Sequence, residues 1–161
     1  PCDEYDVAGE THNFCGMRVF DYDETLFPME KRVIQCNILQ NDENYAYWFG
    51  LKNNISLYNQ EKQRLADDLR LRIEKKYPQH EGKLIVLGTY SPVTFTTWCN
   101  AYKGGYMSFN PQKGYKNKYV KSTIKGLNNL YLASQWIQTS GGLPIAAASG
   151  KFAIDIMKSS R

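Results

Sequence analysis

A glycine turn between two apolar segments near the C-terminus constrains the fold of this chain more than any other feature of its sequence. Residues 130–133 form an apolar run short enough for a buried strand, and a polar break then leads to Gly141 and Gly142. Pro144 suits the first turn of a helix, where its missing N–H group is not needed. Apolar residues then recur at steps of three and four from Leu143 to Met157, and the helix is expected to end at about Lys158. The pattern predicts a strand, a glycine turn and a helix.

The first residues of the predicted helix have small side chains that leave the backbone accessible to other groups. Its first two turns carry mainly small side chains, including three alanines at 146–148, so another group can approach the backbone closely. A helix N-terminus also has free N–H groups and a partial positive charge, which suit a phosphate or an electron-rich ring edge. The same small residues would also let the helix pack tightly on a sheet, and the pattern alone leaves both interpretations open.

The order of residues in this region resembles one family. The segment NLYLASQWIQTSGGLPIAAASGKFAI resembles the C-terminal flavin-contacting segment of phytoene desaturase-like FAD oxidoreductases. That family includes carotenoid isomerases and retinol saturases and is related to amine oxidases. Ser134 and Ile145 stand where the family carries glycine, and Gln135 stands where many members carry an acidic residue.

A second segment resembles the same family. Residues 91–94, Ser-Pro-Val-Thr, are similar to its Thr-Pro-x-Thr element, with Ser91 in place of the threonine. Gly104, Gly105 and Tyr106 are loosely similar to the glycine-bearing loop that faces the flavin and the substrate in that family. The two segments also follow each other in the order that the family shows.

The resemblance implies an FAD cofactor and assigns residues to it. The amides of residues 141–143 are expected near the N1–C2=O2 edge of the isoalloxazine ring, and Gln135 is expected near the ribityl chain. The expected cofactor-binding residues are Gln135, Trp136, Gly141, Gly142, Leu143 and Pro144. The residues expected to line a cavity for an apolar or polyene-like small-molecule substrate are Tyr90, Trp98 and Tyr106. No side chain stands out as a nucleophile or general base, so the catalytic residues are unknown, which is compatible with chemistry carried out by a flavin.

One part of a flavoenzyme is not found in the sequence. No Gly-x-Gly-x-x-Gly turn follows a strand, although such a turn receives the pyrophosphate in Rossmann-type flavoproteins. The chain also begins at Pro1 rather than at a methionine, as expected for an excised fragment or for a processed protein. We therefore interpret it as a fragment of a two-domain enzyme, with a substrate-domain portion at 1–125 and an FAD-contacting strand and helix at 126–161. The N-terminal nucleotide-binding half is the expected partner, and the fragment alone is expected to be inactive and to retain little FAD.

An α+β fold is expected from the remaining patterns. Residues 56–77 have the clearest helical pattern, with Ser56 as a plausible N-cap and Pro78 as the residue that stops the helix. Alternation and short apolar or aromatic runs predict strands at 15–20, 32–40, 45–49 and 83–90. The strands at 32–40 and 45–49 are expected to form a hairpin. The expected sheet is mixed or antiparallel, and the helix at 56–77 is expected to cover one of its faces.

Composition and charge bear on the other classes of function. No apolar run approaches roughly eighteen residues, so no transmembrane segment is expected. Four cysteines without Cys-x-x-Cys spacing predict no metal site, and such sparse cysteines make a reducing, cytoplasmic location the default. A net charge of +4 does not indicate a nucleic-acid partner. The alternative function is a non-enzymatic binding module that uses the Lys/Tyr loop at 113–125 or an aromatic surface.

Overall fold

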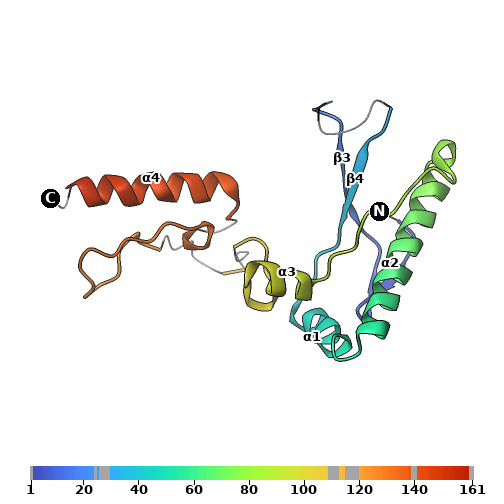
Figure 1. The fold of residues 1–161 in the computed structure, drawn as a ribbon, viewed down its shortest axis with the longest axis horizontal. Helices are drawn as coiled ribbons and strands as arrows, with labels where there is room; N and C mark the ends of the chain where they lie inside the picture. The colour runs from blue at the N-terminus through green and yellow to red at the C-terminus, as the bar shows by residue number, and fades with distance from the viewer. Residues whose placement is uncertain are drawn as a thin grey trace. The chain divides into compact units, whose positions relative to one another are not determined.

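The computed structural model describes residues 2–23, 25, 30–108, 113–114, 120–138 and 141–159. These residues form an α+β fold with four α-helices and two small antiparallel sheets (Figure 1), which confirms the expected class. The chain divides into two compact units, Pro1–Gly104 and Gly105–Arg161. No helix in the described ranges combines the length and the apolar content that a membrane-spanning helix requires.

The first unit begins with a short β-hairpin. β1 (Tyr5–Val7) pairs with β2 (Glu10–His12) in antiparallel register. Ala8 and Gly9 connect the strands with φ angles of +53° and +78°. A two-residue turn with both residues at positive φ matches the twist of a hairpin, so this backbone geometry sets the register of the pair.

A second hairpin follows. β3 (Gly16–Phe20) pairs antiparallel with β4 (Val33–Asn37), and Met17 lies opposite Cys36. These strands confirm the predictions at 15–20 and 32–40. The predicted pairing of 32–40 with 45–49 is wrong, because the preceding strand takes that place and the later segment is helical.

Helix α1 (Asp42–Leu51) replaces the strand predicted at 45–49. The side chain of Asn41 accepts hydrogen bonds from two N–H groups of the first turn, and the side chain of Asn44 accepts one from the N–H group of Asn41 in return, each at 2.9 Å. This reciprocal cap satisfies donors that a helix start would otherwise leave free. The cap outweighs the modest strand preference of the aromatic residues, and the helix buries Trp48.

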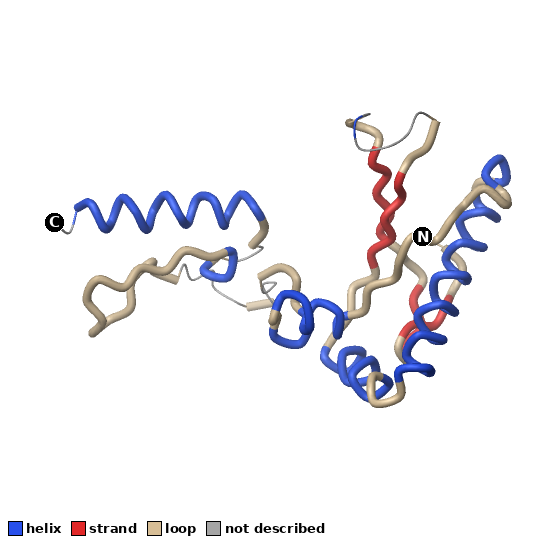
Figure 2. Tube along the Cα trace, in the orientation of Figure 1, coloured by secondary structure: helices blue, strands red, loops and turns tan. Residues whose placement is uncertain are grey.

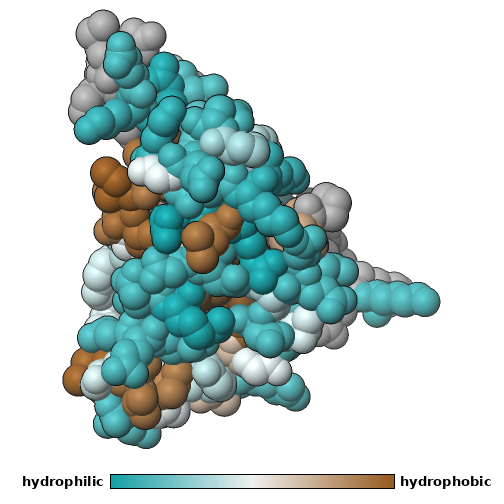
Figure 3. Space-filling model, turned by 90° about the vertical axis from the view of Figure 1, so that its right-hand side faces the viewer, coloured by the Kyte–Doolittle hydropathy of each residue, from teal (hydrophilic) through white to brown (hydrophobic). Residues whose placement is uncertain are grey.

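Helix α2 (Ile55–Lys76) confirms the helix predicted at 56–77. Its N-cap is Asn54 rather than Ser56, because the Asn54 side chain accepts the N–H group of Leu57 at 3.3 Å. The helix ends just before Pro78, as predicted. Figure 3 views the molecule from the side on which α2 lies in Figure 1, and hydrophilic side chains predominate there with hydrophobic patches among them.

The core of the first unit is small and centres on Trp48. The Trp48 ring meets the ring of Tyr58 edge-on at 6.0 Å, and its Nε1 donates to Oε1 of Gln40 at 2.9 Å. Helix α3 (Pro92–Cys99) adds Val93 to this cluster. The other buried members come from β1, the turn after it and α2: Tyr5, Val7, Ala8 and Leu65. One cluster therefore joins the first hairpin to three helices.

The segment predicted as a strand at 83–90 does not enter a sheet. Figure 2 shows the connection between α2 and α3 as loop, apart from the short helical turn after α2. Ile85 and Leu87 are 78% and 79% exposed. The prediction of a buried strand is wrong here, because the segment pairs with none of the strands in the described part of the chain and its apolar side chains are largely exposed.

The second unit is organised by its C-terminal helix. α4 (Leu143–Ser159) confirms the predicted helix, and a 3₁₀ turn, η4 (Gln135–Ile137), precedes it. The strand predicted at 130–133 is not formed. Tyr131 makes a single β-bridge with Thr123, and the N–H group of Leu132 donates to the carbonyl oxygen of Ser122 at 2.7 Å.

Candidate functional site

The glycine turn predicted at 141–142 is formed at the start of α4. Gly141 and Gly142 have φ angles of +53° and +88°, in the left-handed region that favours glycine. The N–H group of Ala146 donates to the carbonyl oxygen of Gly142 at 3.0 Å, so Gly142 is the residue from which the helix starts. The residue directly before the helix is therefore a glycine, so this residue places no side chain over the backbone at the start of α4.

The two glycines differ in what surrounds them. A Cβ atom at Gly141 would lie 2.7 Å from both the Cβ and the backbone nitrogen of Ser108. A Cβ atom at Gly142 would have its nearest neighbour at 3.8 Å, on Pro144. Gly141 is therefore required by close backbone packing, whereas a Cβ atom at Gly142 would make only ordinary van der Waals contacts, with Pro144 and Met107.

An open pocket of about 400 Å³ lies at the start of α4, with Gly142 in its lining. The residues that line it come from two separate segments of the second unit: Tyr106, Met107, Gln135, Gly142, Leu143 and Ala146. Four of these six residues were assigned from the sequence, three to the cofactor and Tyr106 to the substrate. The structure thus brings together residues from both segments that resemble the flavoenzyme family.

Gln135 holds this pocket together. Its side-chain oxygen Oε1 accepts the N–H group of Gly142 at 3.0 Å, and its Nε2 donates to the carbonyl oxygen of Tyr106 at 3.3 Å. One side chain therefore ties η4 both to the glycine turn and to the segment before Met107. The family resemblance implies that Gln135 lies near a ribityl chain. In the structure, its side chain connects two walls of the pocket by hydrogen bonds.

The amides expected to face a flavin ring are not all free. The N–H group of Gly141 donates to the carbonyl oxygen of Gln138 at 3.2 Å, and that of Gly142 donates to Gln135. The N–H group of Leu143 has no acceptor among the residues that the structure describes. Of the three amides, only that of Leu143 is therefore available to a ligand in the pocket. The helix dipole adds a partial positive charge at the same end of α4.

Two buried serines support the turn and were not predicted. The Oγ atom of Ser149 accepts the N–H group of Ser134 at 2.9 Å and donates to the carbonyl oxygen of Ala146 at 2.8 Å. The Oγ atom of Ser108, beside Gly141, is buried and has no hydrogen-bond partner among the residues that the structure describes. Ser149 lies within the small-residue run, which could have suggested close packing, whereas nothing local in the sequence marks Ser108.

The remaining assigned residues lie at different places. Pro144 is in the first turn of α4. Trp136 is in η4, and 40% of its surface is exposed. Tyr90 and Trp98 belong to the first unit, where their rings form an edge-on pair at 5.5 Å, and both are largely exposed. Tyr106 belongs to the second unit, so the structure brings Tyr90 and Trp98 together and places Tyr106 in the other unit.

The Ser91–Thr94 element and Gly104 are neighbours within the first unit. A Cβ atom at Gly104 would overlap the carbonyl group of Pro92, and the φ angle of Gly104 is +72°. The Oγ atom of Ser91 shares a hydrogen bond of 2.6 Å with the Tyr58 hydroxyl group, which fixes the start of α3 to α2. The two parts of the second family-like segment thus pack against each other.

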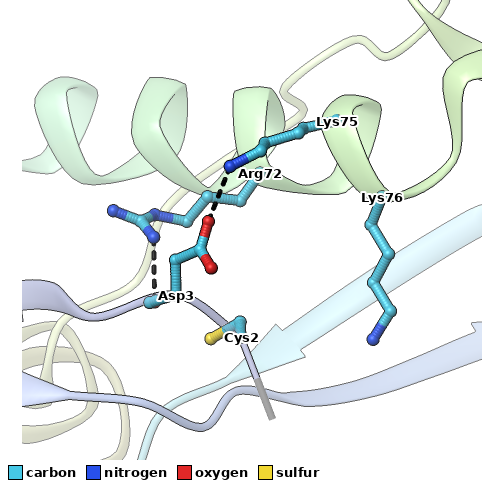
Figure 4. A pocket seen from close by; sticks show the side chains of 5 residues that line it. All are labelled: Cys2, Asp3, Arg72, Lys75 and Lys76. Carbon is cyan, nitrogen blue, oxygen red and sulfur yellow. Dashed lines mark hydrogen bonds and ion pairs between the residues drawn. The ribbon is translucent and has the colours of Figure 1, made fainter.

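A second pocket lies beside α2 (Figure 4). Its lining residues are Cys2, Asp3, Arg72, Lys75 and Lys76. Lys75 pairs with the carboxylate of Asp3 at 2.7 Å and lowers the pKa of that carboxyl group, while Arg72 donates to the Asp3 carbonyl oxygen at 2.9 Å. Arg72 and Lys75 thus tie the N-terminal segment to the helix, and we assign this pocket no ligand.

Neither a metal centre nor the basic loop adds a candidate site. Within the described ranges, no group of three or more His, Cys, Asp or Glu side chains could hold a metal ion. Of the Lys/Tyr loop at 113–125, residues 115–119 lie outside the described residues.

In comparisons with known proteins, no family model, curated protein or solved structure matches the chain.

Proposed function

We propose that this chain supplies the C-terminal cofactor-contacting part and a portion of the substrate domain of an FAD-dependent oxidoreductase of the phytoene desaturase-like kind. The observation that supports this proposal is the pocket at the start of α4. Tyr106, Gln135, Gly142 and Leu143 carry the resemblance to that family, and all four line this single pocket.

The chemistry of the pocket suits the edge of a flavin ring. A bound flavin would supply the electron transfer, and the protein would bind the ring and stabilise its reduced form. The N-terminus of the 17-residue helix α4 carries a partial positive charge, which favours negative charge on a ring edge placed beside it. The N–H group of Leu143 would donate to that edge, and the absence of a side chain at Gly142 would let the ring approach.

The size of the pocket fits only part of the cofactor. Its volume of about 400 Å³ and its open side would accommodate a ring edge, with the ribityl chain leaving beside Gln135, while the nucleotide part of FAD would lie elsewhere. The proposal therefore includes an N-terminal nucleotide-binding half of the same protein, which would carry a Gly-x-Gly-x-x-Gly turn and receive the pyrophosphate. Tyr106 and Met107 would form the apolar side that faces a hydrophobic substrate.

The test is flavin occupancy of the full-length protein, measured from its visible absorbance. Gly142→Val places a branched side chain in the pocket and should lower occupancy at least tenfold. Gly126→Val is the matched control, because Gly126 has a similar φ angle of +87° and no atom within 4 Å of its added Cβ. Unchanged occupancy in Gly142→Val, or an equal loss in both variants, would refute the proposed contact. A full-length protein without any bound flavin would favour the binding-module alternative.

A further inference from the structure

Two cysteines meet on one face of the β3–β4 hairpin. Cys36 lies in β4 opposite Met17, and Cys15 directly precedes Gly16, which is paired with Asn37. Side chains alternate along a strand, so Cys15 and Met17 share a face, and residues opposite each other across the ladder also share a face. Cys15 and Cys36 are therefore diagonal neighbours on the same side of the hairpin.

The surroundings of the two thiols make them chemically unequal. Both are half-buried, and Cys15 also packs against the core cluster that contains Tyr5. The pKa of the Cys15 thiol is lowered to about 7, chiefly by its interaction with the Cys36 thiol and against the effect of burial. The Tyr5 hydroxyl group and the Asn37 amide lower it further, whereas the pKa of Cys36 is raised by Cys15 and by burial. Cys15 is thus the nucleophile of the pair.

We propose that Cys15 and Cys36 form a peroxide-sensitive dithiol that closes to a disulfide across β3 and β4. The Cys15 thiolate attacks one oxygen of hydrogen peroxide, a sulfur–oxygen bond forms, the oxygen–oxygen bond breaks and hydroxide leaves as water after protonation. Cys36, deprotonated as it attacks, then displaces hydroxide from the Cys15 sulfenic acid, and this second hydroxide also leaves as water. Two thiols lose two electrons in total, and one peroxide molecule is reduced to two molecules of water.

The position of Cys15 allows the bond to close. Diagonal neighbours in an antiparallel pair lie about 7–8 Å apart, and a disulfide needs Cα atoms within about 7 Å of each other. The required approach is therefore on the order of 1 Å. Cys15 lies one residue outside the paired ladder, which begins at Gly16, so it can move without breaking a strand pair. Cys99 is exposed and lies on α3, which makes it an internal control for unspecific oxidation.

The experiment treats the intact protein with increasing hydrogen peroxide, blocks the remaining thiols by alkylation, and maps tryptic peptides by mass spectrometry without reduction. The background variant is Cys2→Ser, because Cys2 and Cys15 share the peptide 1–18. The expected product joins peptide 1–18 to peptide 33–52, while Cys99 remains open to alkylation. Fragmentation of the same linked peptide from the unsubstituted protein places the bond at Cys15, and this result does not depend on the folding of the variant.

A second variant separates the two steps. Cys36→Ser should leave a sulfenic acid at Cys15 that dimedone traps, and it should form no linked peptide. A thiol with a pKa of about 7 is about half ionised at neutral pH, against about 3% for a thiol with the reference pKa of 8.5. A thiolate of lower pKa is also a weaker nucleophile, so Cys15 should react roughly threefold faster than a cysteine in a reference peptide. Oxidation of Cys99 at equal or lower peroxide, or conversion of Cys15 to a sulfinic acid without a linked peptide, would overturn the proposal.

Discussion

Replacement of Gly141 by alanine should loosen the pocket at the start of α4, and replacement of Gly142 should not do so to the same extent. Both residues have positive φ, so an added Cβ costs each about 1 kcal/mol in backbone conformation. Only at Gly141 would the Cβ meet a neighbour at 2.7 Å, and that neighbour includes the backbone nitrogen of Ser108. Forced overpacking of this kind costs about 2 kcal/mol more.

Amide hydrogen exchange of the intact protein measures this difference locally. An additional 2 kcal/mol corresponds to about 30-fold faster exchange, provided that exchange reports the local opening equilibrium. The peptides to follow contain the N–H groups of Ser134 and Gly142, which donate to Ser149 and Gln135. Exchange in Gly141→Ala that stays within threefold of that in Gly142→Ala would refute the close contact with Ser108. It would also refute our account of why glycine occupies this position.

Three further predictions concern the first unit. Tyr58→Phe removes the 2.6 Å hydrogen bond to the buried Ser91 and should lower the free energy of unfolding by about 1–3 kcal/mol in urea titrations, and a change below 0.5 kcal/mol would contradict it. Asn41→Ala removes the cap of α1 and should cost about 1 kcal/mol by the same measurement, whereas an unchanged midpoint would show that the cap is dispensable. The alkylation rate of Cys15 should rise as pH increases through about 7, because its lowered pKa leaves it as thiolate above that pH, and a midpoint above 8.5 would contradict the interaction with Cys36.

Helices α2 and α4 were predictable from the sequence because their signals are local, whereas α1 was predicted as a strand and α3 was not predicted. The periodicity of residues 56–77, the stop at Pro78 and the Gly-Gly-Leu-Pro start of α4 each act within a few residues. The aromatic run at 45–49 was predicted wrongly because the side chains of Asn41 and Asn44 cap each other. A capping pair of two asparagines is a weaker sequence signal than Ser or Thr followed by Glu, so the aromatic preference for strands dominated the prediction.

The strands and the site depend more on distant partners. Residues 83–90 and 130–133 have apolar patterns typical of strands, but pairing requires an edge that no local pattern supplies. The same holds for the pocket, where the sequence identified Gln135 and Tyr106 separately. The hydrogen bond that joins them spans 29 positions, and the buried Ser108 has no sequence signal. A family resemblance can select such residues, but it does not say which of them touch.

The extended segment between α2 and α3 has a consequence for the handling of the protein. Its residues Leu84, Ile85, Val86 and Leu87 combine apolar side chains with backbone groups that pair with nothing in the described part of the chain. Such a stretch is a template for strand addition between molecules, and only Lys83 and the later Pro92 interrupt it. The chain studied in isolation should therefore aggregate with a steep concentration dependence, and a single charge at Ile85 should raise its solubility without disturbing the core around Trp48.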